Sequence, residues 1–155
     1  MKLITMTTRI LAGATLLLMI CALCSAPASA QPIDQPLNAT ETWCSYLEYQ
    51  FSHAPHALAR GYYIINQLEL QGYDVAPLQS TYAHAKHNYC MGKAAYQNGL
   101  YTIPDNPYIF QCKADCYALS GQIAGLVGSS HPYTRGMVRA AAYCFPSYAD
   151  FAGTM

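Results

Sequence analysis

Cysteine is the residue whose number and spacing say most about chemistry in this chain. Of its seven cysteines, two lie within residues 1–30, and the later set is Cys44, Cys90, Cys112, Cys116 and Cys144. In an oxidising compartment, an odd set of this kind predicts disulfides with one thiol left over. Sequence alone leaves the pairing open, so the pairing must be argued from the helices that carry the cysteines.

Two histidines and a methionine form a second set with possible chemistry. His84, His87 and Met91 fall within about 60° of one another on a helix that turns roughly 100° per residue. Imidazole and thioether ligands suit copper, and neutral histidine binds a metal in its ordinary state. A copper site is therefore one hypothesis, and a solvent-facing side with a packed methionine is the interpretation that the sequence favours.

No recognisable catalytic motif accompanies these residues. The chain lacks G-x-S-x-G, H-E-x-x-H and a glycine-rich phosphate loop. A redox enzyme would need C-x-x-C beside a βαβ pattern, whereas Cys112 and Cys116 are separated by three residues in a helical segment. We therefore expect a protein that is not an enzyme and carries no cofactor, unless it binds copper.

Residues 1–30 have the pattern of a secretory signal peptide. Lys2 and Arg9 precede an uncharged run, residues 10–23, and residues 28–30 form an A-x-A cleavage site. The run is about 14 residues long, shorter than the roughly 20 needed to cross a bilayer. The mature chain is therefore expected to be exported, to the periplasm or beyond it, and to lack a transmembrane segment.

Composition limits the partners of the mature chain. The whole sequence has 155 residues, of which 53% are apolar, with eight basic side chains, eight acidic side chains and 14 tyrosines. No stretch is basic enough to hold a phosphate backbone, which argues against nucleic acid. Residues 31–146 are predicted to form one domain, and residues 147–155 a frayed tail.

Helical periodicity runs through the mature chain, and no segment alternates as a strand would. We expect an all-α, compact bundle of about five helices braced by disulfides. The predicted helices are 39–52, 55–71, 77–97, 105–128 and one that opens at Pro132 and stops before Pro146.

Two of these boundaries depend on histidine and proline together. His53 and His56 flank Pro55 and predict a junction between two helices, because proline suits a first helical turn and disrupts a helix interior. His131 directly precedes Pro132 and is expected to cap the last helix.

The fourth predicted helix is expected to lie at the centre of the bundle. One of its sides is apolar throughout: Ile109, Cys112, Cys116, Leu119, Ile123 and Leu126. Its opposite side carries small residues, which would let a second helix approach closely: Ala114, Ala118, Gly121, Gly125 and Gly128.

Antiparallel neighbours indicate which cysteines meet. Cys116 and Cys144 are equally far from the turn that joins the fourth and last predicted helices, so they should lie at the same height in the bundle. Cys90 and Cys112 are placed in the same way on either side of the turn before the fourth helix. We predict these two disulfides, each stabilising by about 3 kcal/mol in the chain-entropy model, with Cys44 as the free thiol. A Cys112–Cys116 bridge is disfavoured, because Cβ atoms at i and i+4 lie about 5 to 6 Å apart. The main rival puts Cys44 against Cys90.

The spacing of Cys90, Cys112 and Cys116 resembles that found in small disulfide-linked helical carriers such as insect odorant-binding proteins. The resemblance covers these three cysteines, because the later ones follow another pattern and the A-x-A signal is bacterial in type.

The many tyrosines point to a function class. They supply rigid, amphipathic contact area of the kind found in protein-binding surfaces. We therefore expect an exported module that binds another protein, for instance as an inhibitor or immunity factor. The alternatives are the periplasmic copper binder and a carrier of a small apolar ligand held between helices.

Overall fold

The computed structural model describes residues 39–154, which belong to one compact unit. Its helices are α2 (Ala39–Leu70), α3 (Ala76–Gln97), α4 (Tyr108–Val127), α5 (Pro132–Cys144) and α6 (Tyr148–Ala152). No strand occurs in this part of the chain, so the predicted all-α bundle is confirmed there. None of these helices combines the length and the apolar character needed to span a membrane. The predicted signal peptide, residues 1–30, lies outside the described residues.

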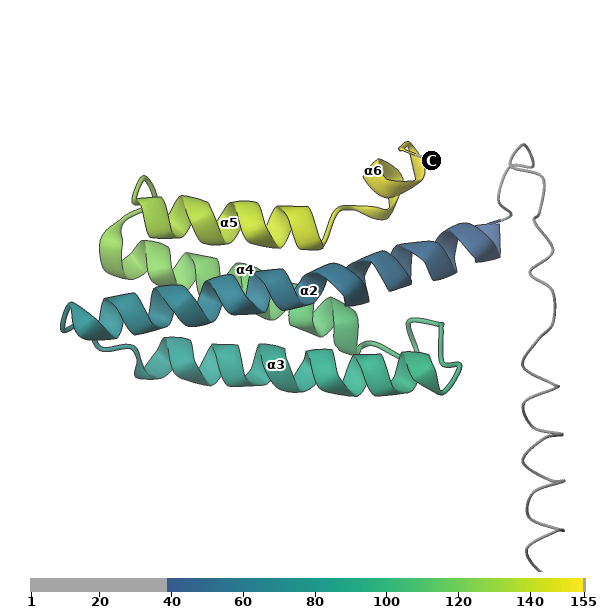
Figure 1. Cartoon of the computed structure of the whole chain (residues 1–155), viewed down its shortest axis with the longest axis horizontal. Helices are drawn as coiled ribbons and strands as arrows, with labels where there is room; N and C mark the ends of the chain where they lie inside the picture. The colour runs from purple at the N-terminus through teal and green to yellow at the C-terminus, as the bar shows by residue number, and fades with distance from the viewer. Residues whose placement is uncertain (1–38, 155) are drawn as a thin grey trace, which may run out of the picture. The chain divides into compact units, whose positions relative to one another are not determined.

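The largest difference from the sequence-based expectation concerns Pro55. Residues 39–52 and 55–71, predicted as two helices, form the single helix α2 with Pro55 inside it (Figure 1). Proline lacks the N–H that would bond the carbonyl four residues earlier, which belongs to Phe51. Tyr89 of α3 supplies the missing donor, because its hydroxyl donates to the Phe51 carbonyl at 3.3 Å. The helix therefore continues through Pro55 with its released carbonyl satisfied.

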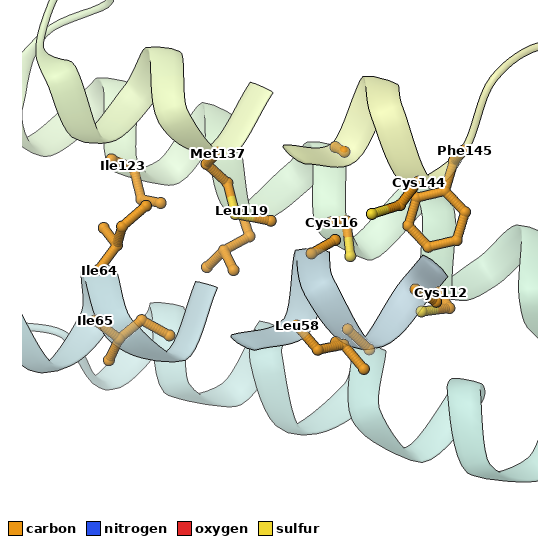
Figure 2. Close-up of a cluster of buried hydrophobic side chains, with 14 of the residues drawn as sticks. Leu58, Ile64, Ile65, Cys112, Cys116, Leu119, Ile123, Met137, Cys144 and Phe145 are labelled. Carbon is orange, nitrogen blue, oxygen red and sulfur yellow. The ribbon is translucent and has the colours of Figure 1, made fainter. Parts of the chain in front are cut away.

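The core lies between α2, α3, α4 and α5, which run alongside one another (Figure 1). α4 contacts each of the other three, and α2 does so as well, so the central place predicted for α4 is shared by two helices. The buried side chains of α4 recur at the predicted helical spacing: Ile109, Cys112, Cys116, Leu119 and Ile123. Figure 2 shows part of this stripe facing Met137 and Cys144 of α5 and Ile64 of α2.

The small-residue side of α4 faces solvent, and its predicted packing role was wrong. A Cβ atom added at Gly121 or Gly125 meets no other atom within 4 Å. The close approach occurs at Gly92 of α3, where an added Cβ would lie 3.2 Å from the Ile109 backbone nitrogen. Because α4 already buries its apolar stripe against three neighbours, its opposite side is left to water.

Residues 147–155, expected to fray, contain the short helix α6. The Ser147 hydroxyl accepts from the Asp150 backbone N–H at 3.1 Å and donates to the Asp150 carboxylate at 2.6 Å. The Phe151 ring packs 5.5 Å from the Tyr46 ring, measured between ring centroids. A local cap and aromatic contacts with α2 therefore hold this segment in a helix.

Candidate functional site

The cysteines are the first predicted site residues to place. All five of those in the described residues are free thiols, and the only near pair is Cys112 and Cys116, with the thiols 4.3 Å apart. Cys112, Cys116 and Cys144 are buried, Cys44 is half-buried and Cys90 is exposed. No pair of these thiols is at disulfide distance, so the predicted Cys90–Cys112 and Cys116–Cys144 bridges are not shown in this part of the chain.

Three thiols gather between α4 and α5. Figure 2 shows Cys116 of α4 and Cys144 of α5 on facing helices, with Cys112 one turn along α4, and no two of these thiols lie at disulfide distance. A hydrogen bond with Cys116, together with burial, raises the pKa of the Cys112 thiol far above its ordinary value. Burial also raises the pKa of Cys144, opposed in part by a hydrogen bond with the Ala57 backbone. Because the thiolate is the reactive form, these two groups are poor nucleophiles at neutral pH.

The predicted copper ligands share the solvent-facing side of α3. His84, His87 and Met91 are all exposed. His84 also reaches α4, because its Nδ1 lies 2.9 Å from a carboxylate oxygen of Asp115, to which the Asn88 amide donates at 2.8 Å. This contact orients the imidazole and leaves Nε2 available. Within residues 39–154, no three side chains of His, Cys, Asp or Glu converge as metal ligands.

The other histidines divide between caps and helix interior. His131 is the N-cap of α5, and its Nδ1 accepts from the Tyr133 backbone N–H at 3.2 Å, which confirms the predicted cap. His53 and His56 were predicted to mark a helix junction, and this was wrong because both lie inside the continuous helix α2.

A second set of polar and aromatic side chains follows the flank of α2 that lies next to α5. Its members recur at spacings of four and three, which places them on one side of the helix: Tyr49, His53, His56, Arg60 and Tyr63. We name these five residues the α2 stripe. The sequence hides the stripe because Pro55 predicts a helix break in its middle. The regular spacing, which continues through Pro55, was the signal that could have shown it.

Helix α5 packs against α2 and contacts the α2 stripe at Tyr49, His53 and Arg60. At one end the Tyr49 hydroxyl donates to the Tyr143 carbonyl at 2.9 Å, and the His53 and Tyr143 ring centroids are 5.4 Å apart. Further along α2, the Arg60 guanidinium lies where a side chain at position 136 would be. A Cβ atom added to Gly136 would lie 2.5 Å from Arg60 Nη2. The two helices therefore present one continuous surface.

Charge on this surface has a single sign. Arg135 and Arg139 are exposed on α5, Arg60 belongs to the α2 stripe, and residues 49–67 and 132–144 contain no Asp or Glu. We name the α2 stripe together with Arg135, Arg139 and Tyr143 the α2–α5 face. Burial, reinforced by the neighbouring Tyr143, raises the pKa of Tyr49, which is therefore neutral at physiological pH.

The bundle thus offers two surfaces with recognisable chemistry. One is the imidazole that Asp115 orients on α3. The other is the α2–α5 face, which combines arginine, histidine and tyrosine without a carboxylate.

When the chain was compared with known proteins, no family model, no curated protein and no solved structure matched it.

Proposed function

We propose that the mature chain is an exported, non-enzymatic helical protein that acts by binding another protein, as an inhibitor or immunity-type module. The observation that carries this proposal is the composition of the α2–α5 face. Arginine and tyrosine are enriched among the residues that dominate binding energy in protein interfaces. Tyr63 and Tyr143 keep 48% and 61% of their surface in water, so their rings are free to contact a partner.

The experiment is recovery of the complex from the compartment of export. The tagged mature chain is purified from the periplasm, separated by size-exclusion chromatography and analysed by mass spectrometry. We expect one protein partner in stoichiometric amount. A Tyr63→Ala, Tyr143→Ala variant should lose this partner, because it removes two exposed rings from the face.

The matched control is Tyr62→Ala, Tyr117→Ala, which removes two exposed rings from other parts of the surface. This control should retain the partner. Purification of the wild-type chain alone, with no stoichiometric protein, contradicts the proposed function.

Disulfide bracing is proposed for Cys116 and Cys144. Both thiols are buried on facing helices, α4 and α5 (Figure 2), and a small shift of these helices would be needed to bring the sulfur atoms to disulfide distance. Their oxidation forms one S–S bond and passes two electrons and two protons to a disulfide oxidant of the export compartment. Non-reducing peptide mapping should find this bridge with Cys44 free. A peptide that joins Cys112 to Cys116, or no Cys116–Cys144 bridge, contradicts the proposal.

Copper binding through His84, His87 and Met91 is a second candidate function, and the contact with Asp115 favours it. A carboxylate on the other ring nitrogen is the usual partner of a histidine that binds a metal. Cu(I) titration should give tighter binding to the wild type than to the His84→Ala, His87→Ala variant. Asp115→Asn should weaken binding by about 10-fold to 100-fold, as loss of such a partner does. Equal affinities contradict the copper site.

A further inference from the structure

We infer that the α2–α5 face is the docking surface for a partner segment rich in aspartate and glutamate. This inference rests on the proposed protein-binding function, to which it adds the place of binding and the chemistry of the partner.

The distribution of charge singles out this face. The two helices of this face carry three arginines and two histidines, whereas every acidic residue of the described chain lies outside residues 49–67 and 132–144. Those acidic residues are Glu41, Glu48, Glu69, Asp74, Asp105, Asp115 and Asp150. An acidic segment therefore meets neutral and positive groups along residues 49–67 and 132–144, with Glu48 and Asp150 next to the Tyr49 end, while a basic segment meets the three arginines. Complementary potentials of this kind select partners and speed their encounter.

The arginines are placed to bind carboxylates from two helices. Arg135 and Arg139 are one turn apart on the exposed side of α5. The Arg60 side chain extends from α2 over Gly136 of α5, which has no side chain to block it. The guanidinium carbon of Arg60 lies 5.5 Å from the Tyr63 ring centroid. A guanidinium pairs with a carboxylate through two parallel hydrogen bonds, which a lysine ammonium does not provide.

The aromatic end of the face is held rigidly. The His53 and Tyr49 rings stack with their centroids 3.9 Å apart, and His53 Nδ1 lies 2.8 Å from the Tyr49 carbonyl oxygen. Since a carbonyl only accepts, Nδ1 carries the hydrogen and Nε2 is left for a partner. Side chains already held in place lose less entropy when a partner binds.

A protein segment fits this face better than a lipid surface or a nucleic acid. Polyanion binding depends on many phosphate contacts, about six to ten in a typical DNA-binding protein. This face has three arginines, in a sequence whose acidic and basic side chains are equal in number. Tyrosine rings interleaved with arginine are instead the composition of protein interfaces.

The test uses a synthetic 16-residue peptide of Glu, Asp, Tyr and Ser as the probe, with fluorescence anisotropy of a terminal dye as the readout. The neutral counterpart replaces each acid by its amide. The variant Arg135→Glu, Arg139→Glu reverses two exposed charges on α5. Its control, Lys86→Glu, Lys93→Glu, makes the same change in charge at two exposed positions of α3.

We expect the mature wild-type chain to bind the acidic peptide and not the neutral one. The α5 variant should bind about tenfold more weakly or worse, because it puts carboxylates against carboxylates. The α3 control should stay within about twofold of the wild type, since charges off the interface act only through a screened field. Circular dichroism melts check that both variants are folded, and Arg139→Gln offers a milder change if charge reversal disturbs α5.

Three results overturn the inference: no binding of the acidic peptide by the wild type, equal losses in the α5 and α3 variants, or tighter binding to phosphatidylglycerol vesicles than to the peptide at equal salt. If a stoichiometric partner is recovered from the periplasm and one of these results is found, the protein-binding function stands and the docking surface lies elsewhere. If no partner is recovered, the proposed function itself fails.

Discussion

Two of the glycines at helix contacts in this bundle, Gly92 and Gly136, make contacts of different kinds. At the α3–α4 contact, Gly92 faces backbone, because a Cβ there would lie 3.2 Å from the Ile109 nitrogen. The Asn106 side chain adds to this contact by donating to the Gly92 carbonyl at 2.9 Å. At the α2–α5 contact, Gly136 faces the end of the Arg60 side chain.

The difference separates a contact made by backbone atoms from one made by the flexible end of a side chain. Backbone atoms at the α3–α4 contact cannot move unless a whole helix shifts, so the distance between these two helices is fixed. The Arg60 side chain can rotate away from Gly136, so the α2–α5 contact tolerates change and displays polar groups to solvent. A bundle of this size can therefore combine a rigid pair of helices with an adaptable one.

The largest effect is expected for Gly92→Leu. The added side chain would overlap α4, and overpacking of this kind costs about 3 kcal/mol. The melting temperature should fall by roughly 10 °C for a domain of this size. Gly125→Leu is the control, because nothing lies within 4 Å of a Cβ at that exposed position. Similar melting temperatures for the two variants would show that position 92 has as much room for a side chain as position 125.

Removing the side chain that supports Gly92 should have the next largest effect. Asn106 is buried and donates to the carbonyls of Gly92 and Leu100. Asn106→Ala leaves these acceptors without that donor, at a cost of about 1 to 3 kcal/mol. Urea denaturation measures the change, and Asn98→Ala, at an exposed position, should stay within about 0.5 kcal/mol of the wild type.

High pH should weaken the buried underside of the α2–α5 contact. Burial raises the pKa of Cys144, whose thiol bonds the Ala57 backbone of α2. The Cys144 thiol contributes its full stabilisation of the folded state below about pH 8.5, the pKa of a thiol in the unfolded chain. This contribution is lost as the pH rises from there toward the higher pKa of Cys144 in the folded state. Under reducing conditions the free energy of unfolding should therefore fall above about pH 8.5, by at most about 1.4 kcal/mol per pH unit from this group.

Cys144→Ala provides the comparison for the pH experiment. Its unfolding free energy at neutral pH should be lower than that of the wild type, but it should decline less steeply at alkaline pH. Parallel pH profiles for the two proteins, measured by urea denaturation with a reducing agent, would show that Cys144 does not titrate as described.

The smallest effect is expected for Gly136→Ala. The new Cβ displaces the Arg60 guanidinium, which is the flexible end of a long side chain. Alanine also has a helix propensity about 1 kcal/mol better than glycine. The thermal stability should be unchanged or raised by up to about 1 kcal/mol, whereas Gly92→Ala should lower it. A clear loss of stability in Gly136→Ala would place the α2–α5 contact in the same class as the α3–α4 contact.

Features that depend on neighbouring residues along the chain were predictable from the sequence. The buried stripe of α4, from Ile109 to Ile123, follows from the 3.6-residue helical period, and His131 before Pro132 predicted the cap of α5. The start of α4 was less predictable. It begins at Tyr108, later than expected, because Asn106 turns its side chain to the Gly92 carbonyl and does not cap the helix.

The remaining features were decided by contacts between distant segments. Pro55 does not end a helix, because the Tyr89 hydroxyl bonds the carbonyl that proline releases, and no local pattern reveals that donor. The α2 stripe becomes a surface only because helix α2 is continuous and α5 lies beside it. The sequence alone therefore determined which side of each strongly periodic helix is apolar, since that depends on spacing. Tertiary structure decided which polar side chains share a surface, since that depends on which helices are neighbours.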